Sequence, residues 1–204
     1  MNNKKNLLGI CGSPRTQGTE FAIKYALNYV KEKFDYKTEF WTVKNKDIKF
    51  CIHCDYCIRE KKGCVHKDDM QELYLKLERT RFILFGTPVF QGTVSGQIKV
   101  IMDRCRALLA KDPNIFKNKI GIGIAVGGDR NGGQETAIRT ILDFFQQNHM
   151  ISVSGGAFGA NLGASLWSKD KGKEGVEKDI EGLRTIRKVL KRMEEFNEQI
   201  LNIL

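Results

Sequence analysis

Residues 6–15 read NLLGICGSPR, an apolar strand that ends in a turn containing glycine and proline. Apolar side chains then recur at every fourth position from Phe21 onwards, which predicts an amphipathic helix. Two further apolar runs, at residues 81–86 and 119–126, are each followed by a glycine-rich turn and another helical pattern. This alternation of buried strands with helices predicts an α/β fold with a doubly wound parallel sheet.

The remaining segments predict a sheet of five strands. Residues 37–43 alternate in polarity, as an edge strand does, and residues 151–158 are expected to form the fifth strand. An amphipathic helix at about residues 174–201 ends the chain, with its apolar stripe at Val176, Ile180, Leu183, Ile186, Leu190 and Met193. No repeat or linker is evident, so we expect one domain over residues 1–204, with a cysteine-rich loop at about 47–67 inserted after the second strand.

The composition is that of a folded protein with a basic surface. Of 204 residues, 41% are hydrophobic and 28% are charged, values that exclude a disordered chain. No apolar run reaches the roughly 18 residues that cross a bilayer, and the N-terminal apolar stretch is too short for a signal peptide, so we expect a cytoplasmic protein without a membrane partner. The net charge of +10 is compatible with a solvated lysine-rich surface, an anionic cofactor, an acidic protein partner or nucleic acid.

Four of the six cysteines lie in one segment, spaced as Cys51-x2-Cys54-x2-Cys57-x6-Cys64. A reducing cytosol disfavours disulfides between them. Structural zinc sites more often use two C-x2-C pairs across a longer spacer. Three cysteines at successive third positions are instead typical of the run that binds a cluster in bacterial ferredoxins. The spacing therefore favours a [4Fe–4S] cluster, with zinc as the main alternative and a redox dithiol or inert thiols as lesser ones.

The neighbourhood of the cysteine segment is basic. Residues 44–67 contain seven basic and three acidic side chains. His53 and His66 adjoin the cysteines, but four thiolates already complete a cluster, so we expect both to be surface histidines. Cys11 and Cys105 stand in apolar stretches and are expected to be buried small hydrophobic residues.

Three predicted loops meet at the carboxyl edge of the sheet, where such folds bind ligands. The first, GSPRTQGT at residues 12–19, contains hydroxyls and an arginine and leads into a helix N-terminus, a combination that suits a terminal phosphate. This loop matches neither the dinucleotide fingerprint nor the P-loop. The second, TPVFQGT at residues 87–93, has a turn stiffened by Pro88, a glycine that admits a flat ligand, and an aromatic face at Phe90. The third, GGDRNGGQE at residues 127–135, has four glycines in seven residues, which we expect to allow close approach to a ring system.

Together these segments resemble the flavodoxin-like NAD(P)H-dependent FMN reductase superfamily, and more narrowly the iron–sulfur flavoproteins of anaerobic microbes. The resemblance extends from about residue 6 to 160. The matching motifs are GSPR at 12–15, TPVFQG at 87–92, IMDR at 101–104, GGDRNGGQE at 127–135 and the four-cysteine loop. The resemblance implies a flavodoxin-like fold, a homodimer or a dimer of dimers, and FMN and a [4Fe–4S] cluster in each subunit.

The resemblance also implies site residues, none of them a catalytic acid or base. The FMN phosphate would be held by Ser13, Arg15, Gln17 and Thr19. The isoalloxazine ring would be bordered by Pro88, Val89, Phe90, Gln91, Gly92, Thr93, Gly128, Asp129, Arg130 and Gly133. The cluster would be ligated by Cys51, Cys54, Cys57 and Cys64. Two positions depart from the family: Gly18-Thr19-Glu20 replaces the Gly-Asn-Thr of many relatives, and Phe90 replaces their tyrosine.

The implied function is electron transfer by a flavin-dependent oxidoreductase. Electrons from a reduced ferredoxin would pass through the cluster and FMN to an acceptor, with oxygen and peroxide among the proposed ones, and the basic cysteine loop could steer an acidic ferredoxin. One alternative is an NAD(P)H-dependent FMN or quinone reductase whose cysteine loop binds zinc or is structural. A second is a zinc-loop protein that binds nucleic acid through the positive charge, which leaves the three loops unexplained.

Overall fold

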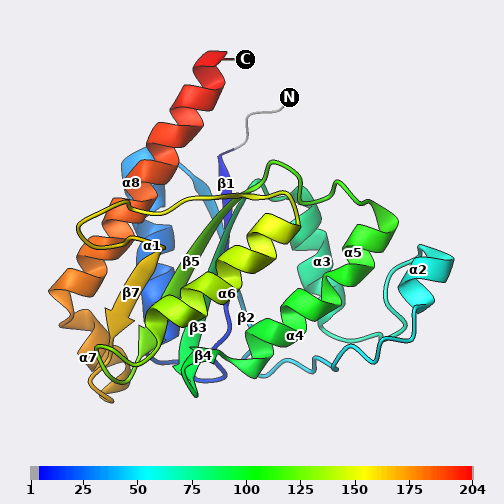
Figure 1. Cartoon of the computed structure of the whole chain (residues 1–204), viewed down its shortest axis with the longest axis horizontal. Helices are drawn as coiled ribbons and strands as arrows, with labels where there is room; N and C mark the ends of the chain where they lie inside the picture. The colour runs from blue at the N-terminus through cyan, green and yellow to red at the C-terminus, as the bar shows by residue number, and fades with distance from the viewer. Residues whose placement is uncertain (1–4, 204) are drawn as a thin grey trace.

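A computed structural model describes residues 5–203 as a parallel sheet between two layers of helices (Figure 1). The sheet has seven strands, and the order along its main path is β2-β1-β3-β5-β6. The strands are β1 (Asn6–Cys11), β2 (Lys37–Thr42), β3 (Phe82–Phe90), β4 (Thr93–Val94), β5 (Ile120–Gly127), β6 (Ile151–Ser152) and β7 (Ala164–Trp167). All pairs are parallel except that between β3 and β4, so the predicted doubly wound parallel sheet is confirmed.

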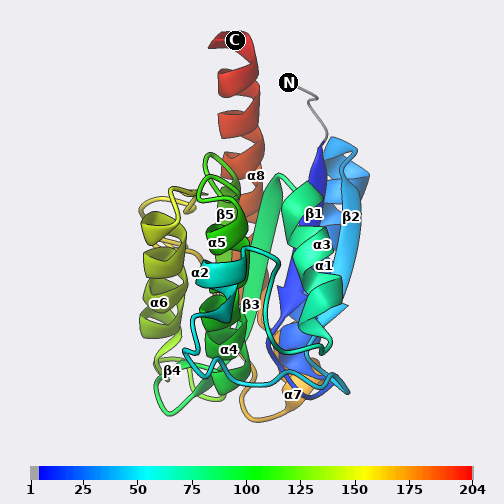
Figure 2. The same ribbon diagram turned by 90° about the vertical axis from the view of Figure 1, so that its right-hand side faces the viewer.

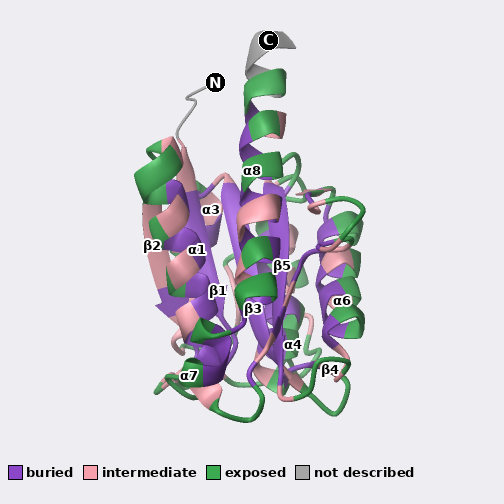
Figure 3. Ribbon diagram, turned by 90° about the vertical axis from the view of Figure 1, so that its left-hand side faces the viewer, coloured by how far each residue is buried: buried purple, intermediate pink, exposed green. Residues whose placement is uncertain are grey.

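Helices cover both faces of this sheet (Figure 2). They are α1 (Gly18–Phe34), α2 (Tyr56–Glu60), α3 (Met70–Arg79), α4 (Gly96–Arg104), α5 (Arg106–Lys111), α6 (Gln134–Gln147), α7 (Gly172–Glu177) and α8 (Ile180–Ile203). Alternate strand residues enter two buried clusters: Leu8 and Ile83 pack with α3 to α6, while Leu7 and Phe82 pack with α1 and α8. Figure 3 shows buried strands beneath helices whose outer faces are exposed. Between residues 5 and 203, no helix combines the length and the apolarity that crossing a membrane requires.

The fifth position in the sheet differs from the prediction. Two short strands, β6 and β7, replace a single strand over 151–158, and both pair with β5. The chain leaves the sheet after β6 because Ser154-Gly155-Gly156 has little tendency to extend a strand. It returns through Gly163, where a Cβ atom would lie only 2.5 Å from the carbonyl oxygen of Gly123. Glycine at position 163 therefore allows β7 to resume the pairing.

The closing helix is divided, which the sequence pattern did not predict. Asp179 lies between α7 and α8, and its carboxylate accepts hydrogen bonds from the backbone N–H groups of Gly182 (3.0 Å) and Trp167 (2.7 Å). The first of these bonds caps α8. Because the break changes the helical phase, Ile180 is 72% exposed instead of belonging to the apolar stripe, whereas Ile186 is buried as predicted.

The second loop begins later than predicted. β3 continues through Pro88 to Phe90, and a two-residue turn with positive φ at Gln91 (48°) and Gly92 (80°) leads into β4. Pro88 therefore lies in a strand and not in the turn. A proline is compatible with this position because β1 pairs with β3 only as far as Gly86, so Pro88 has no partner in β1.

Candidate functional site

The first loop, between β1 and α1, combines an exposed arginine with a helix N-terminus. Ser13 is buried, and its hydroxyl accepts a hydrogen bond from the backbone N–H of Arg15 (3.2 Å), whose side chain is exposed. α1 begins at Gly18, and the side chain of its N-cap residue, Gln17, does not cap it. The first N–H groups of α1 therefore have no partner within the helix, which is the arrangement that binds phosphate in many proteins.

Two of the four predicted phosphate residues use their side chains differently. The Gln17 Oε1 atom accepts a hydrogen bond from the backbone N–H of Lys173 (3.1 Å), which joins the loop to α7. Thr19 is 3% exposed in the first turn of α1. Thr19 can therefore offer its backbone N–H to an anion, while its side chain belongs to the protein interior. The phosphate-binding role of all four residues stays a prediction.

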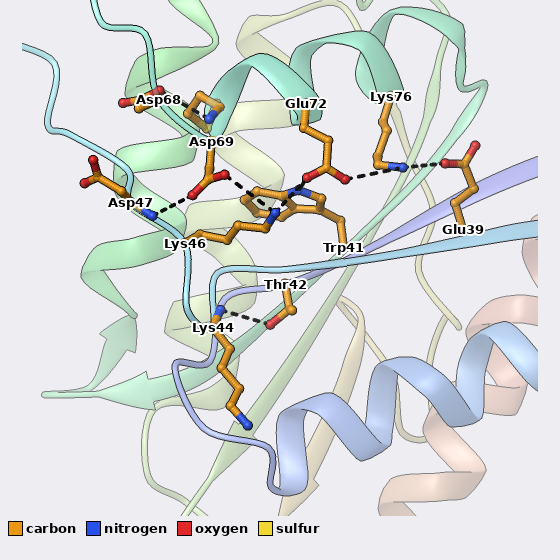
Figure 4. A network of polar contacts seen from close by, with 11 residues as sticks. Glu39, Trp41, Thr42, Lys44, Lys46, Asp47, Asp68, Asp69, Glu72 and Lys76 are labelled. Atoms are coloured by element: carbon orange, nitrogen blue, oxygen red, sulfur yellow. Dashed lines mark hydrogen bonds and ion pairs between the residues drawn. The ribbon is translucent and has the colours of Figure 1, made fainter.

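Lys44 is a candidate site residue that the sequence analysis missed. It follows β2, and its Nζ atom donates a hydrogen bond to Thr16 Oγ1 in the first loop (2.5 Å). Figure 4 shows its side chain extending away from the network around Lys46. A second cation beside the loop strengthens an anion site. The only sequence signal was indirect: β2 is parallel to β1, so the residues after both strands share one edge of the sheet.

The second and third loops are in contact at the same edge. A Cβ atom on Gly133 would lie 2.6 Å from the carbonyl oxygen of Gly92, and Gly133 itself has a φ of 103°. Only glycine fits both requirements. The hydroxyls of Thr93 and Thr140 lie 3.3 Å apart beside this contact, and Phe90 is 39% exposed. The two loops predicted to border a flavin ring therefore contact each other at this edge of the sheet.

Internal packing accounts for two glycines of the third loop that we had assigned to ligand approach. A Cβ atom on Gly127 would lie 2.4 Å from Gln134 Nε2, and one on Gly128 would lie 2.3 Å from Asp170 Oδ1. Gln134 is buried and donates a hydrogen bond to the carbonyl oxygen of Asp129 (2.6 Å), which fixes the loop. A close approach to a ring is thus not needed to explain these two glycines.

The Arg130 side chain is exposed next to this loop and lies over an aromatic ring. Its guanidinium lies over the Trp167 ring, 4.5 Å from the ring centre. Both residues line a recess between the third loop, β7 and the start of α8. A cation over an aromatic face is a stabilising contact. The role of Arg130 at a flavin ring stays a prediction.

Ser95 joins the first and second loops. Its hydroxyl donates a hydrogen bond to the carbonyl oxygen of Gly12 (2.8 Å), and its backbone N–H donates one to Thr87 Oγ1 (2.9 Å). The same hydroxyl accepts a hydrogen bond from the backbone N–H of Ile98 (3.3 Å) and so caps α4. α4 therefore begins where these two loops meet.

The cysteine loop forms a recess that all four predicted cluster ligands line. Cys51 and Cys54 are exposed, and Cys57 and Cys64 are half-buried. The recess has a cavity volume of only about 20 Å³, and its wall also includes Asp55, His66 and Arg106. Burial raises the pKa of the Cys57 thiol, although the guanidinium of Arg106 acts in the opposite direction. The structure thus brings the four predicted ligands together at one place.

The other two cysteines take no part in this recess. Cys11 and Cys105 are fully buried, as predicted. Burial raises the pKa of Cys11 to about 11 and that of Cys105 to about 12. Both thiols therefore stay protonated near neutral pH, as expected of structural residues.

Sulfur is the main donor type around the recess, and thiolates ligate both zinc and iron–sulfur clusters. In the part of the chain that the structure describes, no three His, Cys, Asp or Glu side chains are set to hold one metal ion. Tetrahedral zinc needs sulfur atoms roughly 3.8 Å apart, whereas the thiolates of a four-iron cluster surround a larger object. The Nε2 atom of His66 is buried without a hydrogen-bond partner at this recess, so the predicted surface role is wrong for that atom. A free polar atom of this kind fits a ligand in the recess.

A buried ion pair holds the base of the cysteine loop. The side chains of Arg104 and Asp68 are 1% and 0% exposed, and two hydrogen bonds of 2.6 and 2.9 Å join them. Arg104 also donates to the carbonyl oxygen of Lys49 (2.6 Å), while Asp68 accepts from the N–H of Lys49 (3.0 Å). Although burial raises the pKa of Asp68, the hydrogen bonds from Arg104 and Lys49 lower it below its usual value. One pair thus ties both ends of the loop to α4.

A second network joins the base of the loop to β2 and α3 (Figure 4). Asp69 accepts a hydrogen bond from the backbone N–H of Asp47 (2.7 Å), and Lys46 lies 3.7 Å from Asp69 and 2.8 Å from Glu72. Glu72 also accepts a hydrogen bond from the Trp41 indole (3.3 Å). These contacts hold the two ends of the loop side by side.

Comparison with known proteins identifies similar sequences and folds. A family model described as NADPH-dependent FMN reductase matches residues 6–165. An iron–sulfur flavoprotein of Methanocaldococcus jannaschii is 60% identical over 93% of this chain and 95% of its own length. An iron–sulfur flavoprotein of Archaeoglobus fulgidus is 52% identical over 95% of this chain and 98% of its own length. Two solved structures share the fold at low sequence identity. RosB with a bound formylriboflavin phosphate has a TM-score of 0.73 and 16% identity, and the match covers 97% of this chain and 80% of that one. A WrbA-like flavodoxin of Agrobacterium tumefaciens has a TM-score of 0.66 and 15% identity, and the match covers 95% of this chain and 98% of that one.

Proposed function

Because this chain belongs to the NADPH-dependent FMN reductase family and, within it, to the iron–sulfur flavoproteins, we propose that it passes electrons from a reduced ferredoxin through a [4Fe–4S] cluster and FMN to an acceptor. It is a flavin-dependent oxidoreductase. Oxygen and peroxide are two candidate acceptors. The observation that carries the proposal is the recess lined by four cysteines, which α4 connects to the loops at the carboxyl edge of the sheet.

In this proposal, the residues of the chain bind, orient and shield. Arg15, Lys44 and the first N–H groups of α1 neutralise and orient the FMN phosphate. Phe90 and the contact between Gly92 and Gly133 border the flavin ring. When bound, FMN can exchange two electrons and the cluster exchanges one at a time, so the two groups together convert between two-electron and one-electron transfer. The reaction then needs no catalytic acid or base from the protein.

The test of this proposal is purification without air, followed by a visible spectrum and by iron, sulfide and flavin analysis. We expect about four iron atoms, four sulfides and one FMN per chain, and reduction of both groups by reduced ferredoxin. Flavin that NAD(P)H reduces steadily in a protein without iron would instead favour the reductase alternative. Tight, salt-dependent binding of nucleic acid to a colourless protein would favour the zinc-loop alternative.

A second prediction concerns the docking of ferredoxin. Lys61 and Lys62 are exposed just after α2, beside the cysteine recess. Replacing both with glutamate should lower the rate constant for reduction by ferredoxin at low salt by about tenfold, because steering by opposite charges is lost. Stopped-flow measurements over a range of ionic strength would show this, and the salt dependence should also become weaker.

The matched control reverses the same amount of charge elsewhere. Lys31 and Lys33 are exposed in the last turn of α1, which Figure 1 shows on the side of the molecule away from α2. The corresponding double glutamate variant should keep most of the wild-type rate. Equal slowing by both double variants, or a wild-type rate that does not respond to salt, would rule out steering by the cysteine loop.

A further inference from the structure

One pair of opposite charges lies at the wall of the cysteine recess. Arg106 is the first residue of α5, and its Nη2 atom lies 2.7 Å from Oδ1 of Asp55. Both residues line the recess, and their side chains are 33% and 45% exposed. Of the described residues in this wall, Arg106 is the only arginine or lysine and Asp55 the only carboxylate. Any group held by the four cysteines therefore has one fixed cation and one fixed anion beside it.

The local backbone fixes the position of this pair. Asp55 has a φ of 58°, and its carbonyl oxygen accepts hydrogen bonds from the backbone N–H groups of Ile58 and Arg59 (3.0 Å each), which starts α2. The Arg59 guanidinium donates to the carbonyl oxygen of Cys54 (2.9 Å). The Asp55 side chain is then held toward α5, where Arg106 meets it. The pair thus fastens the far end of the cysteine loop to the body of the protein.

We propose that Arg106 and Asp55 set the reduction potential of the cluster in this recess, Arg106 raising it and Asp55 lowering it. The inference rests on the proposed function, since it requires a cluster bound by the four cysteines. One-electron reduction adds one negative charge to a group already surrounded by thiolates, and no bond forms or breaks. A nearby cation stabilises the more negative state and a nearby anion destabilises it, both more strongly in a partly closed recess than in open water.

The two charges also mask each other in the wild-type protein. While the pair is intact, the field of Arg106 at the recess is partly cancelled by Asp55. Removing either charge therefore exposes the full effect of the other. This predicts shifts of opposite sign from two substitutions that break the same ion pair.

The experiment is a redox titration of the complete holoprotein without air, with dithionite as the electron source and electron paramagnetic resonance to follow the cluster. Arg106→Gln should make the potential more negative, and Asp55→Asn should make it more positive. In each case we expect about a tenfold change in the ratio of reduced to oxidised cluster at a fixed potential, which corresponds to 59 mV for one electron. Asparagine suits position 55 because it tolerates positive φ well.

Two controls separate charge from structure. Arg106→Lys keeps the charge and should leave the potential close to that of the wild type. Arg59→Gln removes a nearby arginine that does not line the recess, and it should change the potential less than Arg106→Gln does. A purely structural role for the pair would lower the melting temperature of Arg106→Gln and Asp55→Asn alike, without opposite shifts in potential.

Shifts of the same sign, or no shift in either variant, would overturn the proposal. If Arg106→Gln fails to retain its cluster, Asp55→Asn decides alone: a more positive potential supports the proposal and an unchanged one refutes it. A wild-type protein without iron and sulfide would refute the proposed function itself. If the wild-type protein contains a cluster but neither substitution shifts its potential, only this inference is refuted.

Discussion

Replacing Arg104 with methionine is expected to lower the free energy of unfolding by about 3–5 kcal/mol, because it leaves a buried carboxylate without a partner. The side chain of Asp68 is 0% exposed, and Arg104 supplies two of its hydrogen bonds. The carbonyl oxygen of Lys49 loses its donor as well. Denaturant unfolding of the variant and the wild type under the same anaerobic conditions measures the difference.

The same substitution should also loosen the cysteine loop. Both ends of that loop are joined to α4 through Arg104, so we expect iron and sulfide to be lost faster to a chelator in the variant. Arg79→Met is the matched control, since Arg79 pairs with Glu39 at the surface, where the side chains are 57% and 37% exposed, and such pairs contribute about 0–1 kcal/mol. Adding Asp68→Leu to Arg104→Met should restore part of the stability by removing the unpaired charge. An Arg104→Met variant as stable as Arg79→Met would show that the buried pair does not hold the loop.

The strands that decide the fold were visible in the sequence because they are almost entirely apolar. The runs that start at Asn6, Phe82 and Ile120 needed no information beyond their own residues, since strands covered on both faces consist mainly of apolar residues. The division of the fifth position into β6 and β7 was not visible in the same way. It depends on Gly163 meeting the backbone of Gly123, a contact between residues far apart in the chain.

The candidate site also has a part that the local sequence predicted and a part that depends on contacts between distant residues. The spacing of the cysteines predicted which residues line the recess, because all four lie within one short segment. The ion pair that holds this segment in place was not predicted, because Arg104 and Asp68 belong to different elements. The contact of Lys44, after β2, with Thr16 in the first loop was not predicted either. Such partners depend on the three-dimensional arrangement, and no local pattern in the sequence encodes them.

α4 connects the two halves of the candidate site. At its first turn, Ser95 bonds to the loops after β1 and β3, and at its last residue Arg104 bonds to the base of the cysteine loop. Nine helical residues span about 13 Å, so one short helix separates the loops assigned to FMN from the loop assigned to the cluster. This arrangement keeps the flavin loops and the cluster loop in fixed positions, which electron transfer between two groups requires.

Replacing Cys57 with alanine is expected to remove the cluster, with iron and sulfide falling from about four per chain to nearly none, because a four-iron cluster needs all four thiolates. FMN should stay at one per chain, since none of the residues assigned to it lines the cysteine recess. Iron, sulfide and flavin analysis of protein purified without air measures both outcomes, and the visible spectrum should change to that of flavin alone.

Cys105→Ala is the matched control, because Cys105 is equally a free cysteine but is fully buried at the junction of α4 and α5. It should retain the complete cluster and lose roughly 1 kcal/mol of stability through the small cavity it creates. A Cys57→Ala protein with unchanged iron would show that the ligand set is wrong. A wild-type protein with one zinc per chain and no sulfide, and a Cys57→Ala variant that loses this zinc, would instead show that the recess closes around a single ion. These outcomes are distinct because only a cluster contains sulfide, so the sulfide analysis decides between the two kinds of site.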